Sequence, residues 1–235
     1  MRRSVVAGIA LCLAASLAPP ASASTPLPGP AGSGVRGNSY LSMPRIQTFD
    51  CRAGRVGRRV LVLGDSITVL TRASLTRSLR AGGWSVCLDA RRSQSTANGL
   101  DYYVTAGAFP RYVDVIVMAT GSNDIVDPDA MAAQVARARA YAGSRPLLWV
   151  TTWVRRTSGA PSLIAHDLDN SVRVNAAERR PPRQTRVNGL VDWYAFLRAR
   201  TWRPTAYLTD GVHPSLAGAA ARNALIAAAL VRFRR

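Results

Sequence analysis

The stretch VLVLGDSITVL, residues 60–70, decides how this chain folds. Its first four residues are apolar with no polar position between them, which is typical of a strand that is covered on both faces. Gly64, Asp65 and Ser66 follow as a turn directly before a helix, in which leucines at a spacing of four lead to a glycine pair at 82–83 that is expected to cap its end. The stretch therefore predicts a buried strand, a tight turn that carries a serine, and a helix.

Four further apolar runs follow, with helical stretches between them. They cover residues 84–88, 113–119, 147–152 and 187–191. We expect one helix to be capped by Asp127, with Pro128 as its first residue and its end at Ala142, and the last helix to begin near Ser215. Strands that alternate with helices give a doubly wound α/β sheet with right-handed crossovers. The five apolar runs predict five parallel strands.

The N-terminus has the pattern of an export signal. Arg2 and Arg3 precede a short uncharged apolar run, and a small-residue cleavage pattern ends at Ala23. The run is shorter than the roughly 18 to 20 residues of a membrane anchor. We expect a secreted protein with a signal peptide over 1–23, a flexible Pro-, Gly- and Ser-rich arm over 24–38, and a folded domain over 39–235.

Export changes what the cysteines are expected to do. Cys12 would leave with the signal, and a lipoprotein anchored there is disfavoured because Leu11 precedes it where a small residue is expected. Cys51 and Cys87 remain as an even pair in an oxidising compartment, which predicts a disulfide, with two buried free thiols as the alternative. Two isolated cysteines and two distant histidines form no ligand cluster, so we expect no metal.

The charge of the chain is strongly basic. Its 31 basic residues are all arginine and stand against 13 acidic ones, which gives +18, or +16 once the signal is removed. Such a balance ordinarily suggests nucleic acid, but the arginines are scattered rather than gathered in one stripe. We expect a monomer with no specific nucleic-acid partner, and electrostatic contact with an anionic cell envelope.

Polar residues follow the predicted strands where α/β sheets bind their ligands, outside the carboxyl ends. Ser66 lies at a helix N-terminus, where backbone N–H groups favour developing negative charge. Gly121 and Asn123 follow the third run, and Asp210 precedes His213 by three residues, close enough to orient its imidazole. Each element alone could be an ordinary turn, cap or structural histidine. Together they predict a nucleophile, a base and an orienting carboxylate.

With these motifs the chain resembles the SGNH (GDSL) hydrolases over about residues 58–232. Three of the family's sequence blocks are matched, by Gly64-Asp65-Ser66, by Gly121 with Asn123, and by Asp210 with His213. The resemblance implies a flavodoxin-like, three-layer α/β/α sandwich around a parallel sheet of about five strands. It also implies ester hydrolysis through an acyl-enzyme, with neither metal nor organic cofactor.

The resemblance also assigns roles at the site. It implies Ser66 as the nucleophile, His213 as general base and then acid, and Asp210 as its orienter. The oxyanion would be held by the Ser66 N–H and the Asn123 side-chain amide.

One block departs from the pattern, because the glycine that usually supplies a third oxyanion donor is missing. The corresponding stretch, residues 89–95, reads DARRSQS. We expect Ser93 to donate its N–H there if its φ is negative, with Arg92 as the alternative if the register is shifted by one. Loss of one donor would raise the barrier by about 3 kcal/mol and leave a weak enzyme.

The expected function is that of a secreted serine esterase acting on small acyl esters, acetyl above all, of a small molecule or a glycan. Residues 189–194, GLVDWY, together with the Asp210 block also resemble extracellular SGNH domains that O-acetylate cell-wall polymers. The first alternative is therefore an O-acyltransferase or O-acetylesterase acting on cell-wall polysaccharide. The second is an inactive SGNH fold that serves as a basic binding module.

Overall fold

A computed structural model describes residues 44–48, 58–179, 187–200 and 204–233. It contains a six-stranded sheet in the order β1-β3-β2-β4-β5-β6. The strands are β1 (Arg45–Thr48), β2 (Arg59–Gly64), β3 (Ser85–Arg91), β4 (Val115–Ala119), β5 (Leu147–Val150) and β6 (Gly189–Val191). The last five are parallel in the predicted doubly wound order, and β1 pairs antiparallel with β3 at the edge. The five predicted strands are confirmed, and β1 adds a sixth.

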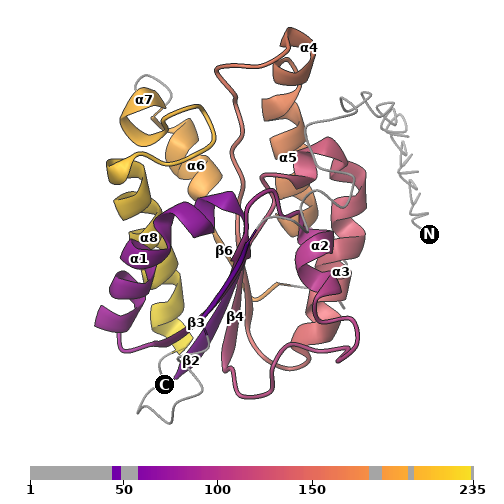
Figure 1. The fold of residues 1–235 in the computed structure, drawn as a ribbon, viewed down its shortest axis with the longest axis vertical. Helices are drawn as coiled ribbons and strands as arrows, with labels where there is room; N and C mark the ends of the chain where they lie inside the picture. The colour runs from indigo at the N-terminus through magenta and orange to yellow at the C-terminus, as the bar shows by residue number, and fades with distance from the viewer. Residues whose placement is uncertain (1–43, 49–57, 180–186, 201–203, 234–235) are drawn as a thin grey trace, which may run out of the picture.

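Helices cover both faces of this sheet. The α-helices are α1 (Ser66–Ala81), α2 (Thr96–Asp101), α3 (Met131–Ala142), α4 (Pro161–Ile164), α5 (Asp167–Arg179), α6 (Trp193–Arg198), α7 (Pro204–Tyr207) and α8 (Leu216–Leu230). Short 3₁₀ turns are η3 (Asp124–Val126), η4 (Pro128–Ala130) and η6 (Val231–Phe233). Figure 1 shows α1, α6 and α8 on one face and α2, α3 and α5 on the other. This is the expected three-layer α/β/α sandwich.

Strand β2 shows why the apolar runs are continuous. Val60 and Val62 pack in the core under α1 and α8, whereas Leu61 and Leu63 pack in the core under α2 and α3. All four side chains are fully buried. Because both faces of the strand are covered, its four central positions, residues 60–63, are all apolar. The same strand ends at Gly64, so it delivers the serine turn to the carboxyl edge of the sheet.

The helix starts agree with the sequence at two places and differ at a third. Asp65 caps α1 by accepting from the Ile67 N–H at 3.0 Å, and Ser215 caps α8 by accepting from the Gly218 N–H at 3.1 Å. The expected cap at Asp127 is wrong, because its side chain makes no capping hydrogen bond. The Ala130 N–H closes onto the Asp127 carbonyl at 3.2 Å instead, so a tight 3₁₀ turn precedes α3.

The C-terminal helix lies in an outer layer of the sandwich, with one side buried (Figure 1). By length and composition alone, residues 216–233 are apolar enough to cross a membrane, with a mean hydropathy of 1.4. In the structure α8 packs against α1, and Ile226 and Leu230 are fully buried in the core on that face. The apolar content of α8 is therefore accounted for by packing.

Some predictions fall on residues that the structure does not describe. The signal peptide and the arm, residues 1–38, lie outside the described residues, as does Cys51. Cys87 is fully buried in β3. The disulfide and the processing of the N-terminus therefore stay predictions.

Candidate active site

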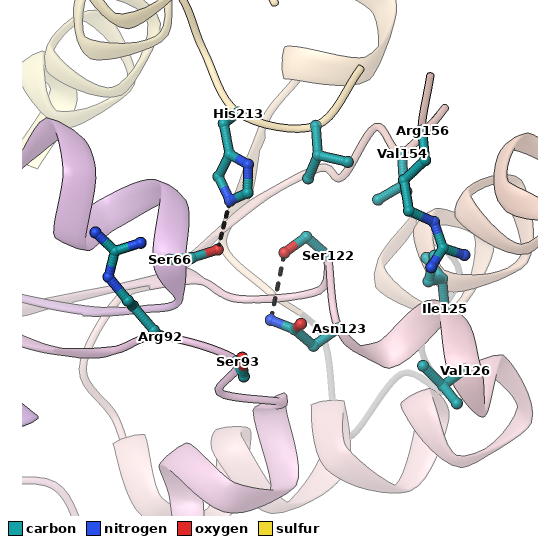
Figure 2. A pocket seen from close by; sticks show the side chains of 11 residues that line it. Ser66, Arg92, Ser93, Ser122, Asn123, Ile125, Val126, Val154, Arg156 and His213 are labelled. Atoms are coloured by element: carbon teal, nitrogen blue, oxygen red, sulfur yellow. Dashed lines mark hydrogen bonds between the residues drawn. The ribbon is translucent and has the colours of Figure 1, made fainter. Parts of the chain in front are cut away.

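The carboxyl edge of the sheet carries a pocket of about 340 Å³. Ser66 enters it from the start of α1, Ser93 from the loop after β3, and Asn123 from the loop after β4. His213 reaches it from the segment that precedes α8, and Figure 2 shows its ring directed at Ser66. Val154 and Arg156, after β5, also line it, so the pocket gathers residues of five separate stretches of the chain, as the topology predicts.

Three of the predicted side chains form a continuous hydrogen-bonded chain. The Ser66 Oγ lies 3.0 Å from the His213 Nε2, and the His213 Nδ1 lies 2.7 Å from the Asp210 Oδ2. The Asp210 Oδ1 accepts from the backbone N–H groups of Val212, at 3.0 Å, and His213, at 2.8 Å. With Nδ1 donating to the carboxylate, Nε2 is left to accept the serine proton. The arrangement can generate an activated serine.

The electrostatics of Asp210 suit this arrangement. Partial burial acts to raise its pKa, but hydrogen bonds from the His213 ring and from the His213 and Val212 backbone outweigh it. They hold the pKa of Asp210 below its ordinary value. The carboxylate is therefore ionised at neutral pH and can stabilise an imidazolium when the histidine takes a proton.

The turn that carries this carboxylate is braced by the segment after β5. The Arg155 N–H donates to the Gly211 carbonyl at 3.0 Å, and the Thr157 N–H donates to the Asp210 carbonyl at 3.1 Å. Gly211 has a φ of +84°, and a Cβ built on it would lie 1.7 Å from the Arg155 carbonyl oxygen. Only glycine fits this close approach, so packing requires the glycine that follows Asp210.

Two donors face the position where an oxyanion would form. The Ser66 N–H belongs to the first residue of α1, where the helix itself provides no acceptor. The Asn123 Nδ2 donates to the Gln94 carbonyl at 3.0 Å, and its second contact, to the Ser122 Oγ, is a long 3.5 Å. A contact of that length is weak enough for an oxyanion to replace it. The structure thus brings both predicted donors to the pocket.

The third predicted donor has an unexpected backbone conformation. Ser93 has a φ of +56°, so the negative φ that was the condition for a non-glycine donor here is not met. The turn that ends β3 imposes the left-handed conformation that glycine adopts freely, although the residue here is a serine. Ser93 lines the pocket, and within the described residues its N–H has no hydrogen-bond partner. It therefore occupies the place of the missing glycine, and its N–H is available.

Replacing this serine by glycine tests the strain at the turn. Ser93→Gly is expected to raise the free energy of unfolding by up to about 1 kcal/mol, because relief of the left-handed strain exceeds the added chain entropy. Ser93→Val is expected to lower it, since a β-branched residue tolerates this φ least. Urea unfolding of wild type and the two variants measures the order of their free energies of unfolding. A glycine variant less stable than wild type would contradict the assignment of strain.

Buried carboxyl groups lie behind the pocket. Burial raises the pKa of Asp65, although a hydrogen bond from Ser122 and the charge of Arg222 oppose it. Burial also raises the pKa of Asp124, to about 6, while its oxygens accept from the Thr96 N–H at 3.0 Å and the Thr96 hydroxyl at 2.9 Å. These contacts tie the oxyanion loop to the start of α2.

Glu178 is the least expected of these groups. It is fully buried on α5, and within the described part of the chain neither carboxyl oxygen has a hydrogen-bond partner. A Cβ built on Gly121 would lie 3.5 Å from its Oε1, so the side chain sits directly under the oxyanion loop. Burial raises its pKa well above the ordinary value, and the nearby charge of Asp124 adds to the effect.

This burial predicts a pH-dependent effect of Glu178→Gln. The native protein keeps Glu178 protonated to a higher pH than the unfolded chain, which ionises it above a pKa of about 4.3. The stability that the protonated group contributes is therefore present below that pH and lost as the pH rises toward the raised native pKa. The melting temperature of the variant relative to wild type is expected to increase between pH 4 and pH 7. A difference that stays constant over this range would contradict the prediction.

Other polar residues stay outside the site. His166 lies in the turn between α4 and α5 and is not among the residues that line the pocket. Asn175, which could have lined it, is buried and holds the Thr152 backbone with its side-chain amide, at 2.7 and 2.9 Å. Among the described residues, no group of three or more His, Cys, Asp or Glu side chains is placed to hold a metal ion.

Comparison with known proteins gives no match by sequence and several by structure. No protein-family model and no curated protein matches the chain. The catalytic domain of a peptidoglycan O-acetyltransferase from Streptococcus pneumoniae matches with a TM-score of 0.54 at 18% identity, over 77% of this chain and 98% of its own.

Two further structures extend the likeness. A GDSL-like lipase from Bacteroides thetaiotaomicron matches with a TM-score of 0.54 at 16% identity, over 75% of this chain and 89% of its own. An acetyl xylan esterase from Geobacillus stearothermophilus matches with a TM-score of 0.53 at 16% identity, over 75% of this chain and 94% of its own. At such identities the likeness shows the fold, which is the α/β/α fold of the SGNH (GDSL) hydrolases.

Proposed function

We propose that this chain, which has the SGNH hydrolase fold, is a serine ester hydrolase that acts on small acyl esters, acetyl esters above all. The observation that carries the proposal is the chain from Ser66 through His213 to Asp210, at 3.0 and 2.7 Å, beside the N–H groups of Ser66 and Ser93 and the Asn123 amide. A serine, a base and a set of oxyanion donors in one pocket are what acyl transfer requires.

The proposed mechanism has two steps. His213 takes the proton of Ser66 as its Oγ attacks the ester carbonyl, and the oxyanion of the tetrahedral intermediate is held by the donors of the pocket. The alcohol leaves with the proton from His213, and water then resolves the acyl-enzyme by the same route. Release of 4-nitrophenol from 4-nitrophenyl acetate tests the proposal, and a rate equal to that of buffer would contradict it.

A transferase is the second candidate, because one neighbour in structure is a peptidoglycan O-acetyltransferase and two others are esterases. The two functions differ only in the acceptor that resolves the acyl-enzyme. Acetate release should be followed with and without a cell-wall glycan acceptor. Turnover that does not need the acceptor supports the hydrolase, and turnover that appears only with it supports the transferase.

Export and envelope contact belong to the proposal through the N-terminal sequence and the basic composition. An envelope-bound protein would remain on isolated cell walls at low salt and leave them as the ionic strength rises. The rival reading, a binding module without chemistry, predicts the same retention. It also predicts no ester hydrolysis, so the two are separated by the assay with 4-nitrophenyl acetate.

A further inference from the structure

We propose that the ester taken by this pocket carries a carboxylate, and that Arg92 is the specificity-determining residue that recognises it. The inference rests on the proposed ester hydrolysis and narrows its substrate class. The side chains that line the pocket are basic or uncharged.

The side chains that line the pocket include two arginines, Arg92 and Arg156, and no acidic residue of the described chain. The carboxylate of Asp210 points to the His213 ring, and Asp65 is buried beneath the start of α1. A cleft lined by charges of one sign raises the local concentration of ligands of the opposite sign.

The two arginines have different surroundings. The Arg156 Nε and the Arg156 backbone N–H both donate to the Asp167 Oδ2 at 2.9 Å, and its Nη2 pairs with the other carboxylate oxygen. Asp167 is only 1% exposed, so this pair is fixed and its charges largely cancel. In Figure 2 Arg156 lies on the far side of the pocket, beyond Val154. Arg156 therefore acts as a wall of the pocket.

Arg92 has no such partner. Its side chain is exposed, and among the described residues no carboxylate pairs with it. It directly precedes Ser93, and Figure 2 shows it on the side of the pocket where Ser66 lies. Its charge is thus uncompensated at the rim of the pocket (Figure 2). A guanidinium binds a carboxylate or a phosphate with two parallel N–H donors, and the single uncompensated charge of Arg92 matches the single charge of a carboxylate.

The chemistry of the ester separates this role from that of an oxyanion donor. A carboxylate on the substrate is charged before and after the reaction, so Arg92 would strengthen the binding of such esters alone. A guanidinium that stabilised the oxyanion would instead accelerate every ester to the same degree, because the oxyanion forms in all of them.

The test compares Arg92→Gln with wild type on three esters. The first is 4-nitrophenyl acetate, which is neutral. The second is the acetate ester of a 4-nitrophenol that bears a carboxylate on its ring. The third is 4-nitrophenyl hydrogen succinate, whose carboxylate is on the acyl group. The kcat/KM of at least one carboxylated ester is expected to fall by about fivefold, and that of the neutral ester by less than about twofold, as for a partly exposed ion pair. The ester whose kcat/KM falls shows whether the recognised carboxylate lies on the alcohol or on the acyl group.

Arg111→Gln is the matched control. Arg111 is also exposed, but it precedes β4 and so lies at the opposite end of the strands. The same loss of one charge there should leave kcat/KM for all three esters unchanged. The fivefold difference at Arg92 should also shrink as salt shortens the Debye length from about 10 Å at 0.1 M to about 3 Å at 1 M.

Two results would overturn the inference while leaving ester hydrolysis in place. An equal fall on all three esters would assign Arg92 to the oxyanion, and no fall on either carboxylated ester would show that Arg92 does not bind their carboxylates. If wild type hydrolysed none of the three esters, the proposed function itself would fail and the inference with it.

Discussion

Ser66→Ala is expected to lower kcat for 4-nitrophenyl acetate by at least about 10⁴-fold, because acyl-enzyme formation loses its nucleophile while the oxyanion donors remain. Ser66 lies at the N-terminus of α1 with its side chain partly exposed in the pocket, so removal of one oxygen leaves no buried cavity. The fold of the variant should therefore be intact. Stopped assays at high enzyme concentration measure the residual rate, and circular dichroism checks the fold.

Ser122→Ala is the control for this prediction. Ser122 lines the same pocket, but its hydroxyl donates to the buried Asp65 carboxylate, and His213 faces Ser66 instead. This variant should keep ester hydrolysis within about tenfold of wild type, because it loses one supporting hydrogen bond and no reacting atom. If Ser122→Ala were the dead variant and Ser66→Ala the active one, the assignment of the nucleophile would be wrong.

Asp210→Asn is expected to lower kcat by about 10³- to 10⁴-fold without unfolding the protein. The asparagine oxygen can still accept from the backbone N–H groups of Val212 and His213, which now bond to the Asp210 Oδ1. Its amide nitrogen, however, cannot accept from the His213 Nδ1. The ring then carries its proton on Nε2, where it cannot accept a proton from Ser66. The loss would arise from the wrong tautomer.

A second aspartate provides the comparison. Asp114 is exposed at the start of β4 and accepts from the Arg59 N–H at 2.7 Å, at the end of the sheet away from the pocket. Asp114→Asn removes the same charge and should leave kcat unchanged. An Asp210→Asn variant that kept wild-type turnover would contradict the role of the carboxylate in orienting the histidine.

The parts of the fold that could be predicted are those where one physical requirement dominates the sequence. Strand β2 is apolar at residues 60–63 because both of its faces are covered there, and the Gly-Asp-Ser turn follows directly. Strand β1 was missed because it is only four residues long, half-buried, and polar at alternate positions. Its place in the sheet comes from pairing with β3, which no local pattern reveals.

Some residues of the candidate site could be predicted from the sequence, and others could not. Ser66, Asp210 and His213 could be predicted because their spacing and strand-end positions encode the contact. Ser93 could not be described in full, because its left-handed backbone is set by the turn between β3 and α2. Glu178 was missed altogether, since a glutamate in a polar helix is typical of a solvated face, and only the tertiary packing buries it.

The burial of Arg222 is the feature that the sequence predicts least. An arginine in an alanine-rich helix is expected to face water, yet this side chain is 2% exposed on α8. Burial lowers its pKa to about 10, and the Asp65 carboxyl opposes that effect. The charges of Arg222 on α8 and Asp65 at the nucleophile turn therefore interact although the two residues are far apart in the sequence.

The central claim is that Ser66 is an activated nucleophile, and covalent labelling of the wild-type protein by a fluorophosphonate tests it most directly. We predict one adduct for each chain, located by peptide mass spectrometry on Ser66, and no adduct in Ser66→Ala. A wild-type protein that forms no adduct, or forms it on another residue, would contradict the account.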